Sequence, residues 1–404
     1  MCRGCHADTL VSILDLDVQP LANELLPSAK SPESSFPLHL RICATCGLGQ
    51  VGEFVLPDRI FSNYPYLSSV STSWVAHARS FAERMTRDLG LGTSDLVVDV
   101  ASNDGYLLRR FVDLGIPVLG VEPAQNIATL AQESGVETLP VFLGVETARQ
   151  IVDSRAQPRL VTANNVLAHV PDLDDFVGGL SVLCGSHTVI TVENPSFLKL
   201  LRETQFDTIY HEHFSYLSVI AVRALVARHG LELVRIEELP THGGSYRYWI
   251  VRRGFGFDDG TVEAAAKREV ADGLLSSQLW VDFEKRSRTT ISGFREWLDQ
   301  MMLSGSRIAA YGAAAKGNTL LNAARVTSQE IGLVADGSVE KQGKYLPGSR
   351  IAVVAPSELA QYGPSEVLIL PWNLASEISV INAELVPDAQ CWKAVPTMTR
   401  LGIS

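Results

Sequence analysis

The run Tyr210-His211-Glu212-His213 places two imidazoles, a carboxylate and a phenol within four consecutive residues. An imidazole can be tuned to titrate near neutral pH, and a neighbouring carboxylate can orient it and stabilise its cation. The two histidines flank the glutamate directly, which is not the spacing of an HExxH zinc helix, and no convincing third metal ligand follows. The run therefore indicates general base catalysis rather than a metal centre.

Two polar strand ends indicate a cofactor site. An apolar run over residues 95–100 leads into a loop at residues 101–105, and Glu122 ends a second apolar run. Acidic groups there suit an amine-bearing cation better than a pyrophosphate, and Glu122 can accept hydrogen bonds from both hydroxyls of a ribose. Either acid alone would fit a helix cap or a solvated loop, but together, and without GxGxxG, they indicate S-adenosylmethionine (SAM). The predicted cofactor residues are Asp99, Ala101, Ser102, Asn103, Asp104, Gly105, Glu122, Asn164 and Asn165.

Three further loops contain candidate substrate-binding groups. His169 follows the third predicted strand and either faces a substrate or is held by the backbone at a helix start. The paired glycines of residues 241–245 either present backbone N–H groups to a ligand or form a plain turn. Lys316 begins a helix after a glycine, where it could hold a phosphate, although the segment is not a Walker loop. The candidates are Thr241, His242, Gly243, Gly244, Ser245 and Lys316.

Two CxxC pairs, Cys2/Cys5 and Cys43/Cys46, predict a structural zinc site. A two-residue gap lets two thiolates converge on one tetrahedral ion, and four thiolates leave no open position for chemistry. A redox CxxC is expected near a βαβ pattern, which is missing here, and simple buried thiols are the remaining alternative. Cys184 and Cys391 are isolated and are interpreted as small buried hydrophobic residues.

The elements that must position these groups alternate between strands and helices, which predicts an α/β protein with a doubly wound parallel sheet. Short apolar runs precede residues 101, 123, 164 and 193, and a second alternating block begins near Arg307. We expect a loop-rich zinc-binding module over residues 1–70 and a Rossmann-like SAM methyltransferase domain over 71–260. A charged helical connector and a smaller C-terminal α/β domain follow over 261–404.

Bulk composition limits the function classes. The chain has 404 residues, 46% apolar residues and a net charge of −11, which argues against binding to nucleic acid or to an anionic membrane surface. The N-terminus lacks the apolar core of a signal peptide, and no apolar stretch approaches the ~20 residues needed to cross a bilayer. We therefore expect a cytoplasmic protein with reduced thiols, whose oligomeric state is open, a monomer being plausible.

Several motifs give the chain a resemblance to a known family. The segments FSNYPY (61–66), SNDG (102–105), NVLAHVP (165–171), DTIYHEH (207–213) and THGGS (241–245) carry it, together with the CxxC pairs and residues 311–322. Over essentially its whole length the chain resembles the C-3 methyltransferases that act on dTDP-linked 4-keto sugars in antibiotic deoxysugar biosynthesis. The DTIYHEH and THGGS segments are specific to this family, whereas the SAM loop alone is generic.

The resemblance implies a role for each candidate. His213 would remove the C-3 proton of the sugar, and the other catalytic residues would surround the sugar and support the base or the developing oxyanion. The C-terminal domain would help to hold the nucleotide, and Tyr66 joins the substrate-binding residues. The chain departs from the family at Ala101, where glycine is usual and where a methyl group would crowd the cofactor carboxylate. The implied catalytic residues are His213, Tyr210, Glu212, His169 and Tyr64.

Two alternatives from other functional classes remain open. A nicotinamide-dependent sugar oxidoreductase would use the loop before Lys316 for its dinucleotide, but GxGxxG is absent from both α/β blocks. A zinc-stapled binding protein without turnover would not need the intact run from Tyr210 to His213. Consumption of NADPH would support the first alternative, and failure to consume SAM with any 4-keto sugar would favour the second.

Overall fold

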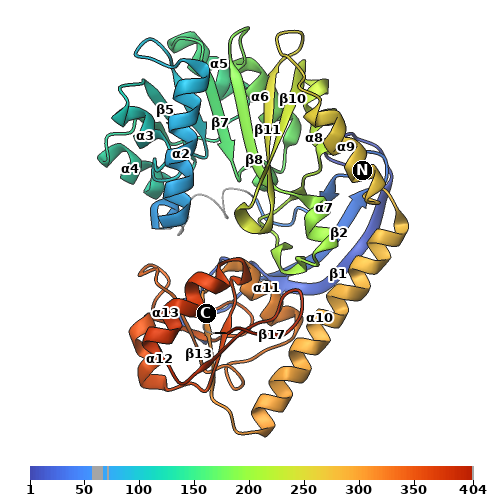
Figure 1. Cartoon of the computed structure of the whole chain (residues 1–404), viewed down its shortest axis with the longest axis vertical. Coiled ribbons are helices and arrows are strands. Elements are labelled where there is room, and N and C mark those ends of the chain that lie inside the picture. Colours follow the sequence, from blue (N-terminus) through green and yellow to red (C-terminus); the bar gives the residue numbers. More distant parts are fainter. Residues whose placement is uncertain (57–66, 71, 403–404) are drawn as a thin grey trace. The chain divides into compact units, whose positions relative to one another are not determined.

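The computed structural model describes residues 1–56, 67–70 and 72–402, which form two compact units (Figure 1). Unit 1 contains the described residues of Met1–Leu10, Cys43–Ser196 and Phe214–Leu274. Unit 2 contains those of Val11–Ile42, Phe197–His213 and Leu275–Ser404. Tyr64 and Tyr66, two of the predicted site residues, lie outside the described residues.

Unit 1 is built on a seven-stranded sheet with the order β10-β11-β8-β7-β4-β5-β6. The five strands from β8 to β6 are parallel, and β11 and β10 are added antiparallel at one edge. The strands are β4 (Val97–Val100), β5 (Val118–Val121), β6 (Thr138–Leu139), β7 (Leu160–Asn164), β8 (Val189–Pro195), β10 (Leu231–Leu239) and β11 (Ser245–Arg252). The prediction of a doubly wound methyltransferase sheet is confirmed.

Helices cover both faces of this sheet, because its central strands are apolar on both sides. Val97 of β4 lies in a core cluster with residues of α2 and α3, whereas Val98 and Val100 lie in a second cluster with α6 and α8. The helices of unit 1 are α2 (Thr72–Leu89), α3 (Leu108–Asp113), α4 (Gln125–Glu133), α5 (Val145–Ser154), α6 (Leu173–Leu183), α8 (Val219–Arg228) and α9 (Thr261–Ala271).

The N-terminal segment contains more regular structure than the sequence indicated. The expectation of a loop-rich module was wrong, since β1 (Leu10–Pro20) and β2 (Ser35–Cys43) are long neighbouring strands. Their buried and exposed residues alternate only in part, and the prolines and serines between them hid the pattern. Within unit 1, the short strand β3 (Gly49–Gln50) pairs antiparallel with β9 (Ser215–Tyr216).

Unit 2 contains the second α/β sheet that the sequence predicts, with the order β14-β13-β12-β15-β16-β17. All of its pairings are parallel except that of β16 with β17. Its strands are β12 (Ile308–Tyr311), β13 (Leu333–Ala335), β14 (Ala352–Val354), β15 (Glu366–Ile369), β16 (Gln390–Lys393) and β17 (Thr399–Arg400). Its helices are α7 (Phe197–Arg202), α10 (Ser277–Leu303), α11 (Ala315–Ala323), α12 (Pro356–Tyr362) and α13 (Ala375–Leu385).

The expected helical connector is mainly α10, a helix of 27 residues whose apolar face is buried. Among the described residues, no helix is both long enough and apolar enough to span a bilayer.

Candidate active site and zinc centre

The four cysteines of the two CxxC pairs converge in unit 1. Their sulfur atoms all lie within 4.8 Å of one another, with Sγ–Sγ distances of 3.7 Å for Cys2/Cys46 and 3.6 Å for Cys5/Cys43. Four thiolates bound tetrahedrally at a Zn–S distance near 2.3 Å would be separated by about 3.8 Å. The geometry therefore fits a closed structural zinc site.

The four-cysteine site is part of the core of unit 1 and is not a separate module. Cys2 and Cys43 belong to the same apolar cluster as Val222 of α8. The guanidinium of Arg228, at the end of α8, donates to the backbone oxygen of Gly4 and contacts an Asp174 carboxylate oxygen at 2.9 Å. A bound zinc ion would thus hold the chain start against α6 and α8.

Metal analysis of the purified protein is expected to give about one zinc per chain. Cys2→Ser should lose the metal and lower the melting temperature, because binding of structural zinc contributes directly to folding. Cys184→Ser is the matched control: it removes a buried thiol of the same unit and should retain zinc. Full zinc occupancy in Cys2→Ser would contradict the assignment.

The predicted cofactor loop follows β4 and is folded tightly against the end of β5. Ala101, Asn103 and Gly105 adopt φ angles of 55°, 50° and 76°, in the left-handed region. The backbone N–H of Asn103 donates to Glu122 Oε2 at 3.0 Å, and that of Ala124 donates to Oε1 at 2.9 Å. Each carboxylate oxygen retains a second lone pair, so Glu122 is oriented by the loop and can still accept from ribose hydroxyls.

Buried polar atoms without partners surround this loop. Asp99 is 2% exposed and accepts a hydrogen bond from Thr162 Oγ1 at 2.5 Å, and its burial raises its pKa to about 7. Unsatisfied buried acceptors are rare in native proteins, and their concentration here indicates a polar ligand. The atoms that lack a hydrogen-bond partner in the described chain are Ser102 Oγ, Asp104 Oδ1, Asn164 Oδ1 and Asn165 Oδ1. The donor and acceptor set fits the amino acid and nucleoside parts of SAM.

Ala101→Gly is expected to raise the free energy of unfolding by about 0.5 kcal/mol. A left-handed conformation costs a residue with a Cβ atom about 1–2 kcal/mol, which exceeds the roughly 0.5–1 kcal/mol by which glycine is entropically worse. Denaturant titration would measure the change. Ala163→Gly, in the strand β7, is the control and should destabilise. An equal loss in both variants would contradict the argument.

The segment at residues 241–245 is fixed by a buried ion network. Thr241 Oγ1 donates to Glu193 Oε1 at 3.0 Å, and Glu193 Oε2 lies 2.7 Å from Nη2 of Arg247 and 3.0 Å from Nε2 of His77. Glu193 is fully buried, and the hydrogen bonds and charges of these partners outweigh burial and lower its pKa. The network comes from α2, β8 and β11, and sequence reasoning missed it.

This network positions His242 beside the cofactor residues. His242 adopts a φ of 54°, and its ring centroid lies 5.2 Å from that of Trp74. Its Nε2 lies 3.4 Å from Nδ2 of Asn165. His169 ends the short helix η2 (Leu167–His169), where its N–H donates to Val166 at 2.8 Å. Unit 1 therefore contains the predicted cofactor loop, both asparagines, His169 and the 241–245 segment.

The run from Tyr210 to His213 lies in unit 2, after the short helix η3 (Phe206–Thr208). His213 Nδ1 is 3.0 Å from the carbonyl oxygen of Thr208, and His213 Nε2 is 2.8 Å from the hydroxyl of Tyr210. A carbonyl oxygen only accepts, so Nδ1 carries the proton and Nε2 accepts from the Tyr210 hydroxyl. The backbone thus holds neutral His213 in the tautomer whose Nε2 can act as a base.

The two residues between them are buried and serve as anchors within unit 2. His211 Nε2 lies 3.2 Å from the backbone oxygen of Phe36, and burial lowers the pKa of His211. Glu212 Oε1 accepts the N–H of Asn23 at 3.0 Å, and burial raises the pKa of Glu212. Neither His211 nor Glu212 is therefore the group that orients His213. That group is the Thr208 carbonyl, which cannot be recognised from the residue types in the sequence.

Lys316 begins α11 within a set of polar and aromatic groups in unit 2. Its Nζ donates to Asn373 Oδ1 at 2.7 Å and lies 4.7 Å from the ring centroid of Trp372. The indole N–H of Trp372 donates to the fully buried Asp207 at 2.8 Å. Burial raises the pKa of Asp207 to about 6, against the positive charge of Lys316. Sequence analysis identified Lys316 but not Trp372 or Asn373.

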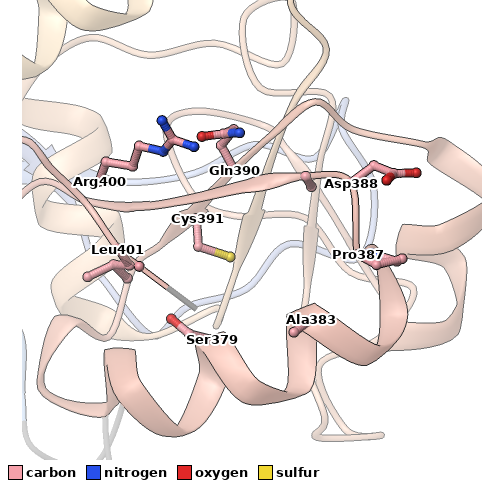
Figure 2. Close-up of a pocket in the computed structure, with 10 residues that line it drawn as sticks. Ser379, Ala383, Pro387, Asp388, Gln390, Cys391, Arg400 and Leu401 are labelled. Atoms are coloured by element: carbon pink, nitrogen blue, oxygen red, sulfur yellow. The ribbon is translucent and has the colours of Figure 1, made fainter. Parts of the chain in front are cut away.

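A pocket of about 480 Å³ lies elsewhere in unit 2, between α13 and the strands β16 and β17 (Figure 2). Cys391, Gln390 and Arg400 line it, and none of the described candidate residues does. The pocket therefore does not belong to the predicted site.

Comparisons with known proteins agree with this organisation. Family models match residues 2–61 as a domain described as zinc-binding, residues 74–236 as a methyltransferase domain, and residues 240–394 as a C-methyltransferase C-terminal domain. The C-methyltransferase NovU of Streptomyces niveus is 35% identical over 383 residues, which is 93% of this chain and 90% of NovU.

Two further similarities are partial. A ubiquinone biosynthesis O-methyltransferase of Rhodopseudomonas palustris (strain HaA2) is 30% identical over 118 residues, covering 29% of this chain and 46% of that protein. The magnesium protoporphyrin IX methyltransferase of Synechocystis PCC 6803 with bound SAH is 18% identical, with a TM-score of 0.35 over 44% of this chain and 83% of that structure.

Proposed function

The chain belongs to the family of SAM-dependent C-methyltransferases, and we propose that it methylates C-3 of a 4-keto-6-deoxy sugar linked to a nucleotide, dTDP. The observation that carries the proposal is the pair of contacts made by His213: Nδ1 lies 3.0 Å from the Thr208 carbonyl oxygen and Nε2 lies 2.8 Å from the Tyr210 hydroxyl, which favours the tautomer protonated on Nδ1. A carbon beside a ketone is a weak acid, so its methylation requires such a base.

The proposed reaction begins with transfer of the C-3 proton to Nε2 of His213. The electron pair of the C–H bond moves toward the C-4 oxygen, and the Thr208 carbonyl stabilises the resulting imidazolium through Nδ1–H. The Tyr210 hydroxyl, released from Nε2, is the group suited to donate to the enolate oxygen. Bound SAM would supply the methyl group. Its sulfonium charge would activate this group toward attack by C-3.

The remaining candidates bind and orient. The loop of residues 101–105 and Glu122 would hold the amino acid and ribose parts of the cofactor, and the Thr241–Ser245 segment and His169 would contact the sugar. Lys316, beside Asp207 and Trp372 in unit 2, would contribute to holding the nucleotide. Tyr64 completes the proposed catalytic set, and Tyr66 completes the proposed substrate-binding set.

Incubation with SAM and a panel of dTDP-4-keto-6-deoxy sugars that differ at C-3 tests the proposal. We expect S-adenosylhomocysteine and a sugar nucleotide heavier by CH2, because a methyl group replaces the C-3 proton, detected by mass spectrometry. The C-3 hydroxyl and amino substrates are then ranked by kcat/KM. Intact sugars and unconsumed SAM across the panel would contradict the assigned substrate class.

A further inference from the structure

Asn194 is a buried amide that no group of the described chain satisfies. Its side chain is 1% exposed, and neither Oδ1 nor Nδ2 has a hydrogen-bond partner. Burying an amide without partners is unfavourable, because the group loses its hydrogen bonds to water and gains none in return. A ligand bound at this position would complete the hydrogen bonds of Asn194, and the location of the residue limits which ligand could do so.

Asn194 lies at the carboxyl end of β8, the edge at which doubly wound sheets bind their ligands. It is in register with Tyr246 of β11, and the carbonyl of the preceding residue, Glu193, accepts the N–H of Asn165 at 2.7 Å. Asn194 is therefore next to the strand end that contains the predicted cofactor residues. Its side chain is not part of the ion network of Glu193, because successive residues of a strand face opposite sides of the sheet.

The face of the sheet on which Asn194 lies contains further candidate groups. Val192 and Ile190, two and four positions earlier in β8, belong to the cluster formed with α6 and α8. The helix η2, which ends at His169, packs against both β8 and β9. Ser215 Oγ, in β9, is another buried atom that has no hydrogen-bond partner among the described residues. Each of these two strands that pack against η2 thus contains a buried polar atom without a partner within the described chain.

We propose that Asn194 positions the methyl acceptor, with Nδ2 donating to one acceptor oxygen and Oδ1 accepting from an adjacent hydroxyl or amino group. The methyl acceptor would be a molecule in which a carbonyl oxygen lies beside a hydrogen-bond donor. This choice of acceptor rests on the proposed function. Asn194 acts by orienting this group toward the reacting centres, so it is a positioning residue and not the base.

The test compares Asn194→Leu, which keeps the volume but removes both polar atoms, with Asn194→Asp, which removes the donor. We expect Asn194→Leu to melt at the wild-type temperature or higher, since an unsatisfied amide is replaced by an apolar group. SAM affinity, measured by calorimetry, should stay unchanged. The kcat/KM for the acceptor should fall by about 10- to 100-fold in both variants, mainly through KM.

Thr191→Val is the matched control in the same strand. Thr191 Oγ1 is also buried and has no partner in the part of the chain that the structure describes, but it lies away from the carboxyl end of β8. This variant should therefore keep full acceptor kinetics. A lower melting temperature with unchanged kcat/KM in Asn194→Leu would overturn the inference. If the wild-type protein methylates no sugar of the panel, the proposed function fails; the melting comparison then decides the inference alone, and a destabilised Leu variant overturns it.

Discussion

His213→Asn is expected to slow methyl transfer by about 10²–10⁴-fold, the usual contribution of a general base. Asparagine can still donate to the carbonyl of Thr208, but it cannot take up the C-3 proton. SAM binding should persist, because the cofactor residues lie in unit 1 and His213 lies in unit 2. Single-turnover kinetics and calorimetric titration with SAM would measure the two effects separately.

His211→Asn provides the control for this experiment. His211 is buried and contacts the backbone of Phe36, so its replacement should reduce stability while leaving the chemical step much less affected. Turnover of His213→Asn within about tenfold of wild type, or an equal loss in both variants, would remove His213 from the role of base.

Glu193→Ala is expected to lower the free energy of unfolding by about 3–5 kcal/mol, because the buried charge of Arg247 would lose one of its carboxylate partners. The Arg247 side chain is 3% exposed, and Glu237, whose Oε2 lies 3.2 Å from Nη1, would be its remaining carboxylate partner among the described residues. The Thr241 hydroxyl would also lose its acceptor. Denaturant titration followed by tryptophan fluorescence would measure the loss.

Glu263→Ala is the matched control, because its pair with Arg223 is exposed and should contribute about 0–1 kcal/mol. A double variant, Glu193→Leu with Arg247→Met, should be more stable than Glu193→Ala, since replacing both charges leaves no buried ion unpaired. If Glu193→Ala cost no more than Glu263→Ala, the network would not stabilise the 241–245 segment.

Much of the fold could be predicted because it depends on local patterns. Four apolar runs bounded by polar turns became β4, β5, β7 and β8, and the CxxC pairs converged as their spacing required. The acids at two strand ends were also brought together, since the carboxyl ends of neighbouring parallel strands meet at one edge. The long strands β1 and β2 were missed because their alternation is weak and a proline-rich loop separates them.

The supports of the candidate site could not be predicted, because they depend on tertiary contacts. His77, Glu193 and Arg247 are separated by 54 or more positions in the chain and meet only when α2 packs on the sheet. The one local signal was Glu193, a carboxylate that directly follows the apolar residues of β8. The tautomer of His213 depends on the backbone carbonyl of Thr208. Every residue has such a carbonyl, so the sequence does not show which one His213 contacts.

The most direct test of the account is to locate the transferred methyl group. Product formed from SAM labelled with ¹³C in the methyl group should show by NMR a ¹³C methyl bonded to C-3 of the sugar, with the C-3 proton absent. The same experiment with His213→Asn should give little labelled product. A ¹³C methyl attached to oxygen, or a product that retains its C-3 proton, would contradict the account.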